Sequence, residues 1–136
     1  GQLRQAMTNL VLNACESVIA RVAQTPEPPG RVRVEGMVAD GRYVIAVLDN
    51  GLGFPGHIAL DRLGDPYVTS KEKGTGLGLA IVKKIIQDHH GSVKLGAMDD
   101  VRIRNNWGTG GAIVVITLPI PLDQNENLKN NISHAA

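Results

Sequence analysis

Residues 71–80, with the sequence Lys-Glu-Lys-Gly-Thr-Gly-Leu-Gly-Leu-Ala, join a glycine-rich turn to a segment with helical apolar spacing. Glycines let a backbone approach an anion closely, and the unpaired N–H groups in the first turn of a helix point at that anion. This stretch therefore has the composition of a phosphate-binding turn. Glycine also ends loops and lets helices pack closely, so a purely structural role is the alternative.

Two further sets of polar side chains interrupt apolar stretches. Asn9 and Asn13 are four residues apart, and the apolar residues around them recur every three or four positions, which predicts a helix from Gln2 to about Ala20. Asparagine is a mediocre helix former, so the pair indicates either a ligand site or hydrogen bonds to a neighbouring loop. Asp49 ends a nearly continuous apolar strand, a position where α/β folds commonly place ligand-binding residues.

Length and composition predict one globular domain. The chain has 136 residues, 43% of them hydrophobic, and a formal net charge of +1. Only four residues are aromatic (Tyr43, Phe54, Tyr67 and Trp107), and the near-neutral charge also argues against a nucleic-acid module. The single cysteine, Cys15, excludes a disulfide or a multi-thiolate metal site within the chain.

The sequence contains no signal peptide and no run of about 18 apolar residues. We therefore expect a cytoplasmic piece without direct membrane contact, excised from a parent that can itself be membrane-anchored. Residues 1–122 form the expected domain, and residues 123–136 form a polar, disordered tail.

Hydrophobic periodicity and turn residues predict the elements that position these side chains. A proline-rich connector follows the first helix, Asp40-Gly41 marks a hairpin turn, and Gly91 ends a second helix, while Pro119 ends the last strand. The predicted strands are Arg31 to Glu35, Tyr43 to Leu48, Ser92 to Leu95 and Ala112 to Leu118, and the second helix runs from Gly76 to about His90.

A long segment from Asn50 to Thr75 separates the second strand from the second helix, with at most a short helix around Ile58 to Leu63. Loops of this length in a compact domain are commonly lids or binding loops. A polar loop from Asp99 to Gly108 precedes the last strand. The expected fold is a two-layer α/β sandwich with a mixed, mainly antiparallel sheet, helices on one face and a long lid.

Four separated stretches resemble, in order and spacing, the motifs of the catalytic ATP-binding domain of sensor histidine kinases. They resemble the N box, first glycine box, F box and second glycine box, and they comprise residues 9–14 (Asn-Leu-Val-Leu-Asn-Ala), 49–53 (Asp-Asn-Gly-Leu-Gly), 65–71 (Asp-Pro-Tyr-Val-Thr-Ser-Lys) and 74–79 (Gly-Thr-Gly-Leu-Gly-Leu). A third glycine-rich element occupies residues 108–111. The resemblance extends from about Gln2 to Pro119 and is greatest to nitrogen-regulation kinases of the NtrY and NtrB type.

The resemblance implies the ATP-binding fold shared with gyrase, a heat-shock chaperone family and MutL. Asp49 corresponds to the aspartate that reads adenine, because a carboxylate accepts a hydrogen bond from the exocyclic amine of that base. Gly51 and Gly53 would leave room for the base, and Asn50 would help at the root of the lid. Asn13 corresponds to the magnesium ligand, an amide oxygen completed by phosphate oxygens and water.

Asn9 indicates the type of reaction. In water-hydrolysing relatives the residue four before the metal-binding asparagine is typically a glutamate general base, and Asn9 cannot take a proton. The resemblance therefore favours phosphoryl transfer to an external acceptor over hydrolysis. Glu16 stands where many histidine kinases carry a cation for the phosphates. Lys71 is the first candidate to replace that charge, and Lys73 is either a second phosphate contact or a solvated lid residue.

The remaining motif residues would contact the nucleotide or shape the lid. Tyr67 takes the aromatic position of the F box, where it anchors the lid, packs on the phosphoacceptor domain or simply packs within the lid, and the same alternatives hold for Phe54. Thr69 and Ser70 either donate hydrogen bonds or form turns. The second glycine box would start the helix beneath the phosphates with Gly74, Thr75, Gly76, Leu77, Gly78 and Leu79.

The expected function is that of a catalytic domain in two-component signalling. It would bind ATP and Mg²⁺ and transfer the γ-phosphoryl group to a histidine on a separate dimerisation and phosphoacceptor domain, with a response regulator as an indirect partner. His57, His89, His90 and His134 all lack the sequence context of a phosphoacceptor. We expect a monomer. The alternatives are an anti-sigma-type serine kinase and a non-catalytic module that senses ATP or ADP.

Overall fold

The computed structural model describes residues 1–54, 78–96 and 111–121, which contain two helices and four strands. Their order is α1 (Gln2–Gln24), β1 (Val32–Ala39), β2 (Arg42–Asp49), α2 (Gly78–Asp88), β3 (Ser92–Leu95) and β4 (Ala112–Pro119). Every helix and strand with boundaries in the described ranges was predicted. The short helix expected around residues 58–63, the loop at 99–108 and the tail from residue 123 lie outside the described residues.

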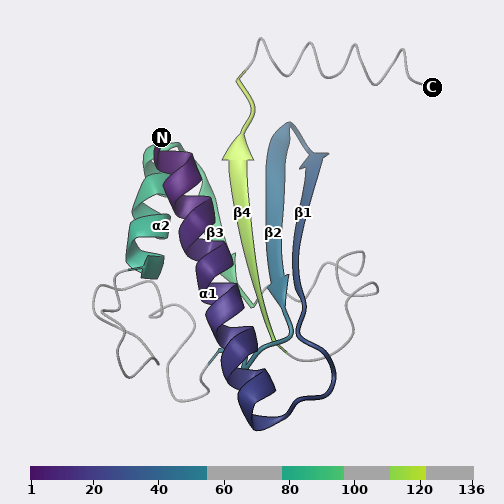
Figure 1. The fold of residues 1–136 in the computed structure, drawn as a ribbon. Coiled ribbons are helices and arrows are strands. Elements are labelled where there is room, and N and C mark those ends of the chain that lie inside the picture. Colours follow the sequence, from purple (N-terminus) through teal and green to yellow (C-terminus); the bar gives the residue numbers. More distant parts are fainter. Residues whose placement is uncertain (55–77, 97–110, 122–136) are drawn as a thin grey trace, which may run out of the picture.

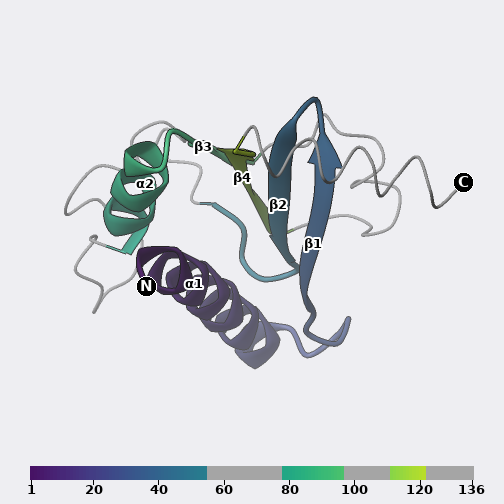
Figure 2. The ribbon, with the colours of Figure 1, turned by 90° about the horizontal axis from the view of Figure 1, so that it is seen from above.

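The four strands form one sheet in the order β1-β2-β4-β3, and each neighbouring pair is antiparallel. Both helices lie on the same face of this sheet (Figure 2), which confirms the predicted two-layer arrangement. α1 runs diagonally along the sheet, and α2 begins beside the middle of α1 and runs back toward its N-terminus (Figure 1). The C-terminal half of α1 consequently passes the end of β2.

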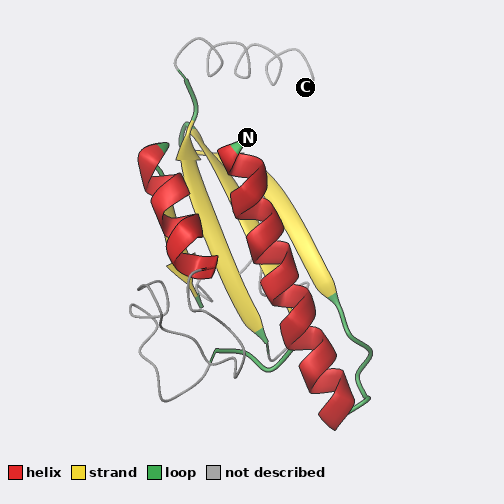
Figure 3. Cartoon of the chain, turned by 60° about the vertical axis from the view of Figure 1, so that its left-hand side comes forward, coloured by secondary structure: helices red, strands yellow, loops and turns green. Residues whose placement is uncertain are grey.

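The core lies between the helices and the sheet. α1 buries Ala6, Leu10 and Ala14 at four-residue spacing, and α2 buries Val82, Ile85 and Ile86. Alternate residues of the strands face these helices and supply Val47, Val114 and Ile116 to the same cluster. Apolar residues at three-and-four spacing in the helices thus pack against apolar residues at two-residue spacing in the strands. Figure 3 shows the two helices lying over one face of the strands.

α1 continues to Gln24, four residues beyond the predicted end at about Ala20. Two bonds link its last turn to the next residue: the Thr25 N–H donates to the Arg21 carbonyl oxygen (2.7 Å), and Nη1 of Arg21 donates to the Thr25 carbonyl oxygen (2.8 Å). These contacts satisfy carbonyl groups that a helix end leaves unpaired, so the helix runs to the proline-rich connector.

β1 is also longer than its predicted range of Arg31 to Glu35, since it extends to Ala39. Gly36 does not interrupt the ladder and pairs with Ile45. The predicted hairpin turn is confirmed: Asp40 and Gly41 have φ angles of 54° and 71°, as a two-residue type I′ turn requires.

α2 ends as predicted before Gly91, but His90 and not the glycine takes the left-handed conformation (φ 63°). The N–H groups of His90 and Gly91 donate to the carbonyl oxygens of Gln87 and Ile86, both at 2.9 Å, which is a Schellman motif. A Cβ at residue 91 would overlap the Thr117 carbonyl oxygen, so glycine is required there for close approach to β4.

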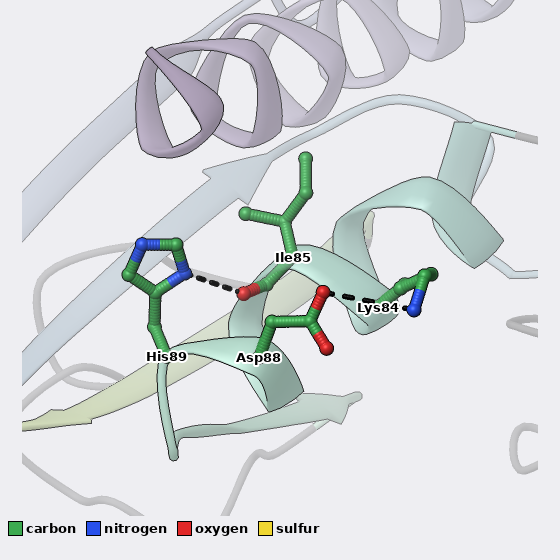
Figure 4. Close-up of polar contacts among 4 residues, drawn as sticks. All are labelled: Lys84, Ile85, Asp88 and His89. Atoms are coloured by element: carbon green, nitrogen blue, oxygen red, sulfur yellow. Dashed lines mark hydrogen bonds and ion pairs between the residues drawn. The ribbon is translucent and has the colours of Figure 1, made fainter.

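Side chains reinforce this end of α2. The ring Nδ1 of His89 lies 2.8 Å from the Ile85 carbonyl oxygen, and Lys84 pairs with Asp88 at 3.6 Å (Figure 4). Both contacts span one helical turn. The His89 contact links the helix end to the carbonyl group of Ile85, whereas the exposed Lys84–Asp88 pair contributes little to stability.

Candidate nucleotide-binding site

A row of polar side chains runs along one side of α1. Asn9, Asn13, Ser17 and Arg21 follow one another at four-residue spacing, and all four are half-buried in a helix that otherwise buries small and branched apolar residues. Residues four apart lie one above the other on a helix, so this polar row extends about 18 Å along its axis. The row divides into two parts with different surroundings.

Asp49 is the last residue of β2 and is only 5% exposed. It pairs in register with Ala112 and lies two residues after Val47, which packs against the helices. Because residues two apart in a strand point to the same face, the Asp49 side chain points to the face of the sheet that the helices cover. The Gly51 N–H donates to its Oδ1 at 2.9 Å. Burial raises the pKa of Asp49 above its usual value, and hydrogen bonds from the Gly51 and Ala112 N–H groups act in the opposite direction.

Asn50 joins the residues after β2 to the residues before β1. Its own N–H donates to the Arg31 carbonyl oxygen (3.2 Å), its Nδ2 donates to the Pro29 carbonyl oxygen (2.9 Å), and its Oδ1 accepts from the Arg31 N–H (2.8 Å). These three bonds continue the β1–β2 pairing past Val32 and Asp49. The role predicted for Asn50 at the root of the lid is therefore, within the described residues, a structural attachment to the connector.

The C-terminal half of α1 holds the same loop from the other side. Nε of Arg21 donates to the Asn50 carbonyl oxygen at 3.0 Å, and Oγ of Ser17 accepts from the Leu52 N–H at 2.9 Å. A Cβ at Gly51 would overlap the backbone and side chain of Ser17. Glycine at this position thus brings the chain directly against the helix, beside the carboxylate of Asp49.

Two more glycines close this part of the site. Gly53 and Gly111 have φ angles of 77° and 85°, which side-chain-bearing residues rarely adopt. A Cβ at Gly111 would overlap the Asp49 carbonyl oxygen, and one at Gly53 would lie 3.2 Å from the Gly111 carbonyl oxygen. Gly111 is the described residue of the third glycine-rich element, and it packs onto the end of β2.

The N-terminal half of α1 faces the start of α2. A Cβ at Gly78, the first residue of α2, would stand 3.8 Å from Nδ2 and 3.9 Å from Oδ1 of Asn13. The structure thus brings Gly78 of the second glycine box beside Asn13 of the N box. Leu79, predicted to contact nucleotide, packs against the hydrophobic core, as does Phe54.

The amide oxygen of Asn13 beside a helix N-terminus fits a hard cation that arrives with phosphate oxygens. Within residues 1–54, 78–96 and 111–121, no group of three or more His, Cys, Asp and Glu side chains could hold a metal ion.

Several predicted site residues lie outside the described residues: Tyr67, Thr69, Ser70, Lys71, Lys73, Gly74, Thr75, Gly76 and Leu77. The described part brings together Asn13 with Gly78, and Asp49 with Gly51, Gly53 and Gly111. Ser17 and Arg21 were not predicted, although they continue the four-residue spacing of Asn9 and Asn13. This four-residue spacing is the sequence signal that could have identified Ser17 and Arg21.

The fold is a two-layer α/β domain. The polar row on α1 has the buried carboxylate of Asp49 near one end and the Asn13 amide beside the start of α2 near the other. Residues 1–122 match the family described as histidine kinase-, DNA gyrase B-, and HSP90-like ATPase. The chain belongs to this family, and it is homologous to sensor histidine kinases.

Among curated proteins, the chain is similar to the nitrogen regulation protein NtrY of Azorhizobium caulinodans, with 46% identity over 67% of this chain and 12% of NtrY. It is also similar to the histidine-protein kinase AtoS of Escherichia coli, with 31% identity over 93% of this chain and 18% of AtoS. The chain thus spans less than a fifth of the length of either relative. The names confirm the predicted likeness to nitrogen-regulation kinases.

Two solved structures share the fold at 28% sequence identity. The mycobacterial sensor histidine kinase MprB matches with a TM-score of 0.66 over 87% of this chain and 70% of its own. Full-length ShkA in complex with AMPPNP matches with a TM-score of 0.63 over 87% of this chain and 21% of its own. In the described part of our chain, neither helix has the length and apolar character needed to cross a membrane.

Proposed function

We propose that this domain binds Mg-ATP and transfers the γ-phosphoryl group to a histidine on a separate dimerisation and phosphoacceptor domain of the same kinase. The observation that carries the proposal is the polar row on α1. Its Asn13 lies beside the start of α2, and its Ser17 binds the loop that follows Asp49. One helix therefore contacts both the candidate base-binding residues and the candidate phosphate-binding residues.

Asp49 supplies the chemistry for adenine recognition. Its ionised carboxylate accepts hydrogen bonds only, so it suits the exocyclic amine of adenine, whereas guanine presents a carbonyl oxygen there. The Gly51 N–H orients one carboxylate oxygen, and burial excludes competing water. The similarity to ShkA, whose structure contains the ATP analogue AMPPNP, supports ATP as the ligand.

Asn13 and the N-terminus of α2 are suited to the phosphates. A helix N-terminus attracts anions, and Gly78 adds no side chain between its backbone and the Asn13 amide. Mg²⁺, held by Asn13 and the phosphate oxygens, would supply charge neutralisation during transfer. We assign further phosphate contacts to Lys71, Thr69 and Ser70 and to the backbone of Gly74, Thr75, Gly76 and Leu77, with Tyr67 anchoring the lid.

Asn9 favours transfer over hydrolysis. It lies one turn before Asn13 on the same side of α1, where an amide can orient a group but cannot remove a proton. Catalysis would then come from positioning and charge neutralisation, with the acceptor histidine as the nucleophile. ATP as the donor places the reaction in the cytoplasm, and the likeness to NtrY supports nitrogen regulation through a response regulator.

A phosphorylation assay tests the proposal. The domain is incubated with Mg²⁺, γ-labelled ATP and the dimerisation and phosphoacceptor domain of a sensor histidine kinase supplied in trans, and binding of Mg-ATP is measured separately by calorimetry. Label that is lost in acid and retained in base supports histidine phosphorylation. Acid-stable label would instead indicate a serine kinase. Binding of ATP without any label would indicate a sensing module.

A further inference from the structure

We infer that Ser17 and Arg21 are positioning residues that hold the adenine-reading loop, residues 49–53, at a set distance from Asn13. The inference rests on the proposed binding of ATP and adds two residues to that site. Neither side chain needs to touch the nucleotide, because each acts through the backbone of the loop.

Arg21 acts through the residue that follows Asp49. Its Nε donates to the Asn50 carbonyl oxygen and its Nη1 donates to the Thr25 carbonyl oxygen, so the planar guanidinium bridges the loop and the end of α1. Its Nη2 is buried and has no hydrogen-bond partner among the described residues. Burying an unpaired donor is unfavourable, so the two carbonyl contacts are the interactions that favour this placement of the side chain.

Ser17 acts one turn earlier on α1. Its Oγ accepts from the Leu52 N–H, and the backbone of Gly51 packs so closely on Ser17 that a Cβ would not fit. The same Gly51 donates its N–H to Oδ1 of Asp49. Movement of this loop away from α1 would therefore change the position of the carboxylate that reads the base.

The attachment of the loop to α1 also fixes the position of the loop relative to Asn13. Asn13 lies on the same helix, one turn from Ser17 and two turns from Arg21. The distance between the two ends of the site is therefore set by one helix. Discrimination between adenine and guanine depends on the placement of the Asp49 carboxylate, since a polar site rejects a ligand whose groups it cannot pair. Loosening the loop should thus lower the preference for ATP over GTP as well as the affinity.

The test compares Ser17→Ala and Arg21→Met with two controls on the same helix, Thr8→Ala and Arg4→Met. Thr8 and Arg4 are exposed side chains of the same types and lie away from the loop. Calorimetry with Mg-ATP and Mg-GTP gives the affinity and the preference of each variant, and thermal denaturation confirms that each is folded. Arg21→Lys keeps a donor for one carbonyl group and serves as the conservative variant if Arg21→Met does not fold.

We expect Ser17→Ala and Arg21→Met to weaken ATP binding about fivefold each, the equivalent of one hydrogen bond. The ATP-over-GTP preference should fall with them, Arg21→Lys should recover part of it, and the controls should match the wild type. Unchanged affinity and preference would overturn the inference. Weaker binding with an unchanged preference would also overturn it, because that result indicates a merely structural role. A wild-type domain that binds no Mg-ATP would refute the proposed function itself.

Discussion

The two ends of the polar row on α1 differ in how they are built. At the C-terminal end, Ser17 and Arg21 bind the loop after β2 through its backbone, and glycines pack onto the carboxylate-bearing strand end. At the N-terminal end, Asn13 presents an amide beside the start of α2. The first end is specified by close packing and by hydrogen bonds within the domain. The second offers neutral and dipolar groups, which suit a ligand that brings its own charge.

The largest effect should come from disturbing the close packing. Gly111→Ala introduces a Cβ that overlaps the Asp49 carbonyl oxygen at a φ of 85°, so we expect a loss of about 3 kcal/mol or more in the free energy of unfolding. Gly36→Ala is the matched control, because its Cβ would meet open space in β1. Urea denaturation measures both. Equal stability of the two variants would contradict the packed character of the first end.

Asp49→Asn should have the next largest effect, on binding. The amide keeps an oxygen for the Gly51 N–H, but it replaces a charged acceptor for the adenine amine by a neutral group. We expect a loss of about 10- to 100-fold in ATP affinity, measured by calorimetry, with the fold retained. An unchanged affinity would show that Asp49 does not read the base.

Asn13→Ala tests the second end and should cost about tenfold in affinity for Mg-ATP. Because the proposed role of the amide is to bind the cation, the loss should be smaller when magnesium is removed with EDTA. Titrations with and without the metal separate the two contributions. An equal loss under both conditions would indicate that Asn13 acts on the fold or on the nucleotide directly.

Asp49 should also change the pH dependence of stability. Burial raises its pKa in the folded state, so the folded protein binds a proton more tightly than the unfolded chain does. The contribution of Asp49 to stability is therefore most favourable at low pH and decreases as the pH rises through the raised pKa. Asp49→Asn removes this cost. We expect it to be more stable than the wild type at neutral pH, with a higher Tm.

Thermal denaturation of both proteins across the acidic range measures this difference. The stability advantage of Asp49→Asn should shrink as the pH falls through the raised pKa of Asp49, because protonation neutralises the wild-type side chain. A constant difference between the two proteins at all pH values would contradict the assigned cause of the pKa shift.

The smallest effect should follow from Asn9→Glu. A carboxylate one turn before Asn13 could accept a proton from water, so a modest rise in basal ATP hydrolysis is expected. Phosphate release measured with Asn9→Gln as the control tests this expectation. Substantial hydrolysis by the wild-type domain would contradict the absence of a resident base and would make the second end a hydrolytic site.

Much of the fold follows from local patterns. The spacing of apolar residues predicts both helices, alternation predicts the strands, and Asp40-Gly41 predicts the hairpin, because these signals act over a few residues. The ends of elements were less predictable. α1 extends to Gln24, where Arg21 and Thr25 cap each other. α2 ends with His90 in the left-handed conformation, and Gly91 lies against Thr117.

The candidate site divides in the same way. The sequence by itself determined Asp49 at the end of a buried strand, Asn9 and Asn13 on one side of a helix, and the resemblance that connects them with ATP. Only the tertiary structure decided which side chains hold these groups in place. Ser17 lies 35 residues from Leu52 and Arg21 lies 29 from Asn50, and no local pattern encodes such pairs. They form because the sheet brings the end of β2 against α1, where the backbone of the following loop lies beside Ser17 and Arg21.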